Sequence, residues 1–296
     1  MRGLAPYAFV LLWSSSFIAA RIGLRHLTPL LFVAIRLTGC AIVLIALMLL
    51  ARRRWPPPRD LLHCGIAGAL VNAIGLMAPH EGLTMVAAAP IALVQSLTPV
   101  LTGVVGAFFF NEALRPWQWL GLMLGVAGVA LVVGLEAEAS TVRLDGMLLA
   151  GLGVAGLVAG TIWFRRFCRD VPLLPGGTAQ FIAAAAVGWI GMALFETPHA
   201  TWTPGTIIAT GWNTCAVSLG GMALYFFMLS RSPAARTTSN FYLVPGTVAI
   251  LGWLLLGEHL TALAITGFIV AGLACWLVSS PTLPMRKPVR RAQQVQ

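Results

Sequence analysis

Three polar side chains recur at helical spacing inside one of the most apolar stretches of this sequence. Gln95, Thr98 and Thr102 stand three and four residues apart, which would place them on one face of a helix. Amides and hydroxyls are costly inside a bilayer and often functional there. We expect this face to line a cavity and to hydrogen-bond a solute. Hydrogen bonding to a neighbouring helix is the alternative.

A second polar face lies at the start of the apolar stretch 237–256, which offers Thr237, Thr238, Ser239, Asn240 and Tyr242. Two further groups could join it: an imidazole that can bond a carboxylate or amine, and an indole that can stack on a planar group. Ordinary interfacial roles are the alternatives for those two. The predicted substrate-binding residues are His80, Gln95, Thr98, Trp163, Asn240 and Tyr242. Together they could hold a zwitterion with a planar side chain.

Arg36 is a solitary basic residue within the apolar stretch 29–51. It either pairs with a carbonyl or carboxylate of the protein or binds the carboxylate of a substrate. We favour the structural role, because the residue stands about two turns from the end of its stretch. A long basic side chain can reach the interface from that depth.

Several kinds of chemistry are excluded by residues that the sequence lacks. None of its nine acidic residues lies in the middle of an apolar stretch, which disfavours antiport of cationic drugs through a buried carboxylate. The sequence contains no Walker loop, HExxH or GxSxG motif. Its five cysteines show no CxxC spacing and should act as small apolar side chains. We therefore expect no enzyme, no metal and no cofactor.

The composition places all these residues in a membrane. Hydrophobic residues make up 58% of the chain and charged residues 9%, and the mean hydropathy is +0.88, so a soluble fold could not cover itself with polar groups. Crossing a bilayer takes roughly 20 apolar residues. We expect one all-α polytopic membrane domain of ten transmembrane helices, over residues 4–24, 29–51, 61–78, 86–110, 117–135, 146–164, 176–195, 206–229, 237–256 and 262–279.

The basic residues indicate how these helices are oriented. With the N-terminus inside, 15 Lys and Arg residues fall in inner segments and three, Arg21, Arg25 and Arg143, in outer ones. Basic residues are retained on the cytoplasmic side, so we expect a bacterial inner-membrane protein with both termini in the cytoplasm. This bias explains the net charge of +10 without a nucleic-acid partner. A cleaved signal in residues 1–21 is the alternative, but it would break the charge pattern.

The chain also repeats itself at an offset of 146 residues. At that shift, without gaps, Ala88, Ala89, Pro99, Gly106, Glu112, Leu114 and Gly121 fall on Ala234, Ala235, Pro245, Gly252, Glu258, Leu260 and Gly267. Chance resemblance between apolar segments is the alternative. We predict a five-helix repeat over residues 1–137, a second over 144–280, and a disordered basic cytoplasmic tail over 281–296. Five is an odd number, so the second repeat is inverted, as in transporters that work by alternating access.

Equivalent prolines mark the centres of two repeat-related helices. Pro99 and Pro245 are expected to kink these helices and to serve as hinges. Each helix leads into an acidic hairpin, Asn111-Glu112 in the first repeat and Gly257-Glu258 in the second. The first helix carries the sequence Trp13-Ser-Ser-Ser-Phe17.

With these features the whole chain resembles the EamA-type members of the drug/metabolite transporter superfamily. Within it, the chain is most similar to bacterial exporters of aromatic amino acids of the YddG type. The resemblance implies ten helices around a central cavity, both termini inside, and export of amino acids or related metabolites, with membrane lipid as the surroundings. An exporter of another metabolite or drug, a pore-forming subunit and an intramembrane lipid enzyme are the alternatives. The oligomeric state stays open.

Overall fold

The computed structural model describes residues 4–85, 91, 94–95, 97–110, 114–133, 144–256 and 262–279. Helix lies in each of the ten stretches that the sequence predicts to cross a membrane. Among the described residues, seven helical stretches are long and apolar enough to span a bilayer, and shorter apolar helices lie at 98–109 and 265–278. The chain is therefore an all-α polytopic membrane protein, as predicted.

The helices follow the apolar stretches closely. The first half of the chain forms α1 (Ala5–Gly23), α2 (Pro29–Leu50), α3 (Pro58–Gly68), α4 (Gly75–Gly82), α6 (Thr98–Phe110) and α7 (Pro116–Val133). The second half forms α8 (Leu144–Phe167), α9 (Leu173–Phe195), α10 (Pro204–Trp212), α11 (Met222–Arg231), α12 (Ala234–Thr238), α13 (Leu243–Leu256) and α14 (Ala262–Ser279). Four of them, α2, α3, α7 and α10, begin with proline, which is favoured at the first helical position because its missing N–H breaks no bond there.

Two of the spans change their helical winding at mid-length. The π-helix η1 (Ala69–Ile74) joins α3 to α4, and the π-helix η3 (Asn213–Gly221) joins α10 to α11. Shifted by the repeat offset of 146, η1 falls on residues 215–220, inside η3. π-Helical segments are rare and are frequently found at functional sites. A 3-10 turn, η4 (Ser239–Tyr242), separates α12 from α13.

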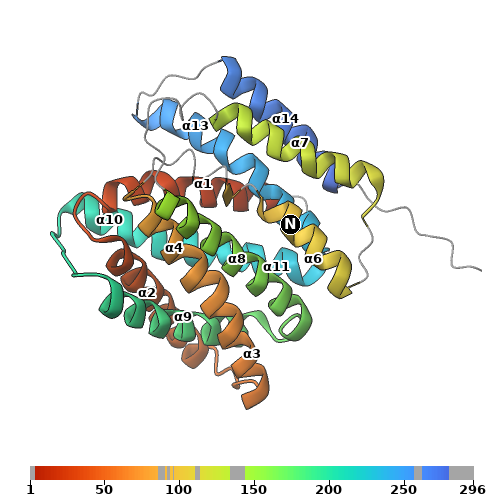
Figure 1. Cartoon of the computed structure of the whole chain (residues 1–296). Coiled ribbons are helices and arrows are strands. Elements are labelled where there is room, and N and C mark those ends of the chain that lie inside the picture. The colour runs from red at the N-terminus through yellow and green to blue at the C-terminus, as the bar shows by residue number, and fades with distance from the viewer. Residues whose placement is uncertain are drawn as a thin grey trace, which may run out of the picture.

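The two halves of the chain interleave rather than packing as separate bodies. Helices that the predicted offset of 146 would relate lie together: α2 packs against α9, and α7 packs against α14 at the top of Figure 1. From the first half, α1 contacts α10, η3 and α13 of the second half. In the reverse sense, α8 contacts η1, α4 and α6. Each half therefore completes the packing of the other.

Four aromatic rings hold the middle of this arrangement. Phe9, Trp13, Tyr225 and Phe241 are all buried, and the centroids of the contacting rings lie 5.2 to 5.9 Å apart. These distances are typical of favourable aromatic pairs. The rings join α1, α11 and η4 across the two halves.

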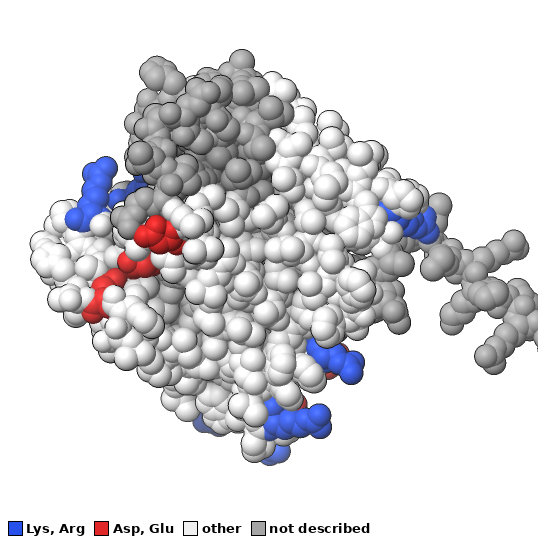
Figure 2. Space-filling model, in the orientation of Figure 1, with Lys and Arg blue, Asp and Glu red and all other residues white. Residues whose placement is uncertain are grey.

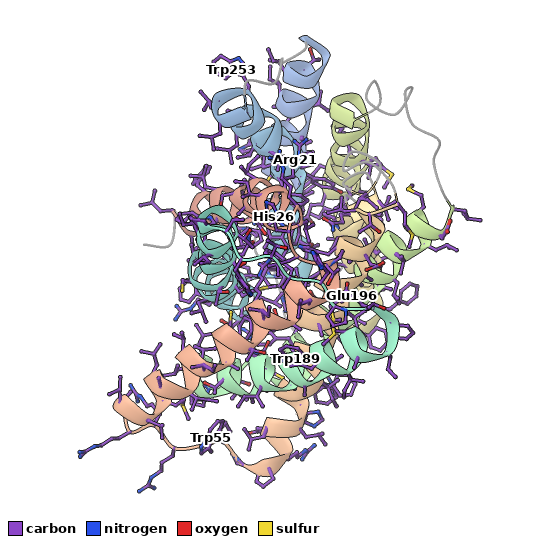
Figure 3. All side chains as sticks on the ribbon, turned by 90° about the vertical axis from the view of Figure 1, so that its left-hand side faces the viewer. Arg21, His26, Trp55, Trp189, Glu196 and Trp253 are labelled. Carbon is purple, nitrogen blue, oxygen red and sulfur yellow. The ribbon has the colours of Figure 1, made fainter. Side chains whose placement is uncertain are left out.

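At one end of the molecule, the α1–α2 and α9–α10 connections are fastened together. Leu27 and Ala200 form an antiparallel bridge. The carboxylate of Glu196 accepts the N–H groups of Leu30 and Leu31 at 2.7 and 2.8 Å, and it lies beside the start of α2 (Figure 3). A carboxylate there satisfies N–H groups that have no partner within the helix. The end of α9 thus caps the beginning of α2.

The outer surface suits a lipid environment. In Figure 2, charged side chains lie towards the edges of the view, and a broad uncharged face separates them. Leu50, Phe108 and Phe195 are each at least 80% exposed. Large exposed apolar side chains over a wide face indicate contact with membrane or protein.

Candidate functional site

His80 lies in α4 and is buried against α2. Its Nδ1 is 2.7 Å from the carbonyl oxygen of Leu76; because a carbonyl only accepts, the proton is assigned to Nδ1. The ring stacks on Phe32 of α2, with centroids 6.2 Å apart and planes 30° apart. In the neutral imidazole Nε2 is then an acceptor, and it has no hydrogen bond among the described residues.

The predicted polar face of residues 95–102 is only partly free to bind a solute. Thr98 opens α6 and is fully buried, and its hydroxyl has no partner in the described part of the chain. The hydroxyl of Thr102 donates to the Thr98 carbonyl at 2.6 Å. Gln95 is half-buried and precedes α6. Thr98 is therefore the member of this face that is both buried and unpaired.

Tyr242 faces α7. Its hydroxyl donates to the carbonyl of Leu122 at 2.9 Å, and its ring lies so close to Gly125 that an added Cβ there would be 2.3 Å from it. The ring also belongs to an apolar cluster that includes α14. In this structure the Tyr242 side chain joins helices, so its predicted contact with a solute stays a prediction.

The other predicted residues of the ninth span lie at breaks in the helix. Asn240 is buried in η4; its Nδ2 donates to the Thr237 carbonyl at 2.8 Å, and its Oδ1 lies 3.9 Å from Cys275 Sγ. Pro245 is the third residue of α13, just after η4. Pro99 is likewise the second residue of α6. Both prolines stand near a helix start, and their service as hinges stays a prediction.

Trp163 lies near the end of α8 in a ring cluster with His63 and Phe167. Its ring centroid is 5.6 Å from His63 and 4.7 Å from Phe167, and His63 stacks on Phe167 at 4.4 Å. Trp163 Nε1 and His63 Nδ1 are buried without a partner in the described residues. This cluster lies towards the end of the molecule that the sequence predicts to be cytoplasmic.

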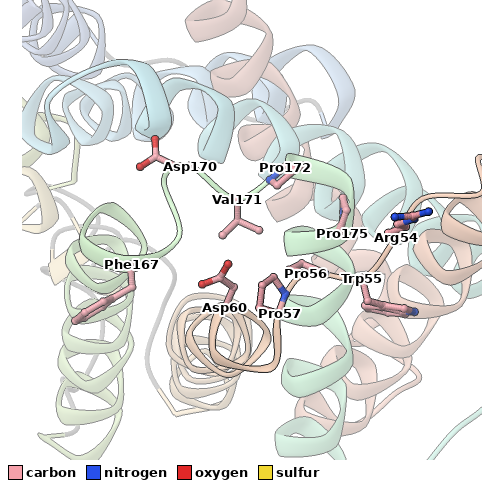
Figure 4. A pocket seen from close by; sticks show the side chains of 10 residues that line it. All are labelled: Arg54, Trp55, Pro56, Pro57, Asp60, Phe167, Asp170, Val171, Pro172 and Pro175. Atoms are coloured by element: carbon pink, nitrogen blue, oxygen red, sulfur yellow. The ribbon is translucent and has the colours of Figure 1, made fainter.

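A cleft of about 460 Å³ opens beside that cluster, between the start of α3 and the turn from α8 to α9 (Figure 4). Its lining includes Arg54, Trp55, Asp60, Phe167 and Asp170. Nothing in the sequence pattern predicts it. Phe167 connects it to the Trp163 ring cluster, so the structure places Trp163 near this cleft and away from the groups at mid-span.

Two cysteines meet behind the cleft. The hydrogen bond that the Cys168 thiol donates to Cys64, together with burial, raises the pKa of Cys168 far above its usual range, so Cys168 stays protonated. Both are free thiols. Among the described residues, no group of three His, Cys, Asp or Glu side chains could hold a metal ion.

No contact in the described part of the chain joins two of the six predicted binding residues directly. Asn240 and Tyr242 share η4, and the others lie on other helical segments around the core. The structure brings together two other sets of polar side chains, one at each π-helix, that the sequence does not predict as units.

The first set surrounds Arg36. Its Nε–H donates to Ser218 at 2.5 Å and its Nη1 to Ser16 at 3.4 Å. Ser16 in turn donates to Asn213 Oδ1 at 2.6 Å, and Asn213 donates to the Ala209 carbonyl at 3.2 Å. All four side chains are buried. Arg36 therefore does not reach for the interface as expected but ties α1 and α2 to η3.

The second set lies at η1. Asn72 of η1 and Gln180 of α9 are 0% and 1% exposed, and neither amide has a hydrogen-bond partner among the described residues. The helices touch here, because a Cβ on Gly68 would lie 2.2 Å from the Gln180 carbonyl. Asn72 is one turn beyond Gly68. Asn72 and Gln180 are each the only amide in an apolar stretch of the sequence. A search for isolated polar residues in such stretches could have found them.

Leaving these amides unpaired is unfavourable. Each buried group without a partner costs about 1–3 kcal/mol, and native proteins keep few of them unless they serve a purpose. An amide can donate to and accept from one ligand at the same time. Asn72 and Gln180 are thus each able to hydrogen-bond a polar solute that reaches them.

Proteins named as transporters are among those similar to this chain. The family model described as "EamA-like transporter family" matches residues 4–134 and again residues 144–280. The uncharacterized inner membrane transporter YedA of Escherichia coli is 25% identical over 96% of this chain and 94% of its own. A probable terminal-alkyne amino-acid exporter of Streptantibioticus cattleyicolor is 26% identical over 94% and 93%.

A solved crystal structure shares the fold. It aligns with a TM-score of 0.78 over 93% of this chain and 95% of its own, at 21% sequence identity. The family match covers nearly the whole described chain in two copies, and the helical architecture agrees with it. The chain therefore belongs to the EamA-like transporter family.

Proposed function

We propose that this transporter exports small organic solutes by alternating access between two inverted halves. Amino acids are the favoured substrate class, and aromatic amino acids are favoured within it. Family membership and the similarity to a probable amino-acid exporter support the substrate class. The preference for aromatic solutes rests on the resemblance described above. The buried, unpaired amides of Asn72 and Gln180 carry the proposal, because a channel wall or a lipid-facing enzyme would not need sealed polar groups at mid-span.

The proposed solute site lies among the helices that carry these unpaired groups. Asn72 and Gln180 would supply amides, Thr98 a hydroxyl and His80 an acceptor at Nε2. In this conformation the Asn72 and Gln180 side chains are buried within the protein. A solute would reach them when the contact between α3 and α9 opens.

The two π-helices support a mechanism with moving halves. A π-helix carries an extra residue in its turn, which weakens the regular hydrogen bonding of the span. Such interruptions at equivalent positions are typical of transporters with inverted repeats, whose binding sites lie near the bilayer midplane. η1 and η3 would allow α4 and α11 to tilt relative to α3 and α10.

Counterflow in proteoliposomes tests this function. Vesicles loaded with an unlabelled aromatic amino acid should accumulate the labelled one transiently, without nucleotide, and uptake should saturate. Non-saturable flux with no counterflow would identify a channel instead. Counterflow with other metabolites but with none of the amino acids would keep a transporter and reject the substrate class.

The orientation is part of the proposal. We expect both termini and the loop 52–54 in the cytoplasm, because basic residues concentrate in those segments. Single-cysteine labelling with an impermeant maleimide in intact cells tests it, and labelling of residue 53 or of the C-terminal tail from outside would reverse it.

A further inference from the structure

We infer that Arg36 binds the carboxylate group of the transported solute. This rests on the proposed function, since it requires a solute that enters the middle of the molecule. Arg36 stands seven residues after Pro29, the start of α2, which puts it about 10 Å from that end of the helix. It is 1% exposed, so its charge is held inside the protein.

The protein uses only part of the guanidinium. Of its five N–H groups, the described residues take two, through Ser218 at Nε and Ser16 at Nη1. Ser218 accepts from Nε and Ser16 accepts from Nη1, and Asn213 holds Ser16 in place by accepting its hydroxyl hydrogen. Within the described part of the chain, the remaining N–H groups, including both on Nη2, have no acceptor. These two hydrogen bonds fix the orientation of the guanidinium but use only two of its five N–H groups.

The residues that the structure describes also leave the charge of Arg36 without a counter-charge. Ser16, Ser218 and Asn213 are neutral, and Arg36 forms no ion pair with any residue that the structure describes. At the same end of the helix, the carboxylate of Glu196 is already bound to the backbone of α2. An arginine buried in a membrane protein without a counter-charge is strongly unfavourable and marks a functional site.

A solute carboxylate supplies what is missing. It carries one negative charge and two acceptor oxygens, which match the arginine fork in a bidentate arrangement. His80 stacks on Phe32, one turn before Arg36 on α2, so an apolar platform and the free Nε2 acceptor lie next to the charge. This neighbourhood fits a solute that joins a carboxylate to a donor group and a planar side chain.

Binding to the purified full-length protein in detergent tests the inference. Isothermal titration compares phenylalanine with its amide, with phenylethylamine and with 3-phenylpropionate. The wild type should bind the two carboxylates at least about tenfold more tightly than the amide and the amine, equal to about 1.4 kcal/mol. Arg36→Gln should reduce this preference to less than about twofold, and Arg36→Lys should retain part of it. Arg25→Gln, which removes an exposed arginine near the same end, should leave it unchanged.

The outcomes separate this inference from the proposed function. Binding of 3-phenylpropionate but not phenylalanine, lost in Arg36→Gln, would uphold Arg36 and reject amino acids as substrates. Amino-acid counterflow with equal binding of acid and amide would uphold the function and overturn the inference. So would a folded Arg36→Gln protein that keeps the tenfold preference, or a wild type that binds neither carboxylate. If Arg36→Gln does not fold, the wild-type preference and its weakening in Ser218→Ala decide the question.

Discussion

The two π-helices have the same backbone feature at equivalent positions but opposite side-chain chemistry. At η3, Asn213 and Ser218 are hydrogen-bonded within a network that holds Arg36. At η1, Asn72 is buried with no partner in the described chain, and so is Gln180 on the adjoining helix α9. The polar side chains at η3 are hydrogen-bonded to other protein groups, whereas the amides at η1 have no hydrogen-bond partner among the described residues.

This difference indicates that the repeat conserves the scaffold and not the chemistry. A duplicated fold gives both halves the same place to bend, but a solute has no two-fold symmetry and cannot use two identical walls. We interpret η3 as the side that positions a charge and η1 as the side that offers neutral donors and acceptors. Substitutions at the two segments should therefore have opposite effects on stability.

The largest expected effect is on stability, at the hydrogen-bonded segment η3. Asn213→Leu removes the acceptor for Ser16 and loosens the support of Arg36, so the free energy of unfolding should fall by about 3 kcal/mol. Unfolding in mixed detergent micelles measures it. A loss below about 1 kcal/mol would show that the η3 network does not stabilise the fold, and the contrast with η1 would disappear.

At the unpaired amides of η1 and α9, a substitution should raise stability and lower transport. Asn72→Leu and Gln180→Leu each replace an unsatisfied amide by an apolar side chain, so unfolding should become about 1 kcal/mol harder. Amino-acid counterflow should nevertheless fall about tenfold, because a solute hydrogen bond is lost. Normal counterflow in both variants at equal protein level would remove η1 from the proposed site.

Tyr242→Phe should lower stability, as Asn213→Leu does, but by less. The variant loses one hydrogen bond, to the Leu122 carbonyl, so stability should fall by about 1 kcal/mol, while counterflow stays within about twofold of the wild type. Both quantities are measured on the same purified sample. A larger loss of counterflow would support the contact between this hydroxyl and the solute that the sequence predicts.

The smallest effect is expected outside both segments. Trp119 is 36% exposed on α7 and is assigned to the aromatic belt at the membrane interface. Trp119→Ala should change stability by less than about 0.5 kcal/mol and leave counterflow nearly normal. If it impaired counterflow as much as Asn72→Leu does, the effects at η1 would not be specific.

The span positions were predictable because they depend on the length of apolar runs, and each predicted stretch contains helix. The offset of 146 places η1 within η3, and the boundaries of the two repeats stay a prediction. The change of winding at Ala69–Ile74 and Asn213–Gly221 was not predictable. Within six to nine mostly apolar residues, the pattern of hydrophobic side chains does not distinguish an α-helical turn from a π-helical one.

The polar contacts were harder to predict than the spans. Arg36 meets Ser218, which lies 182 residues away, and Tyr242 meets a backbone carbonyl on α7. Hydropathy and spacing contain no information on such partners, because they depend on which helix faces which after packing. Thr98 and His80 are buried polar groups, but their predicted contact with a solute stays a prediction.

The interleaving of the halves has a consequence for biosynthesis. The ribosome makes Arg36 long before Ser218, and at about 5–20 residues per second the delay is roughly 10–40 s. During that time α2 carries an unneutralised arginine whose network partner Ser218 has not been translated. The nascent chain must keep this residue near the lipid headgroups or the insertion machinery until α10 and η3 arrive. Quality control of this protein should therefore act late, and a truncated first half should be degraded rather than retained.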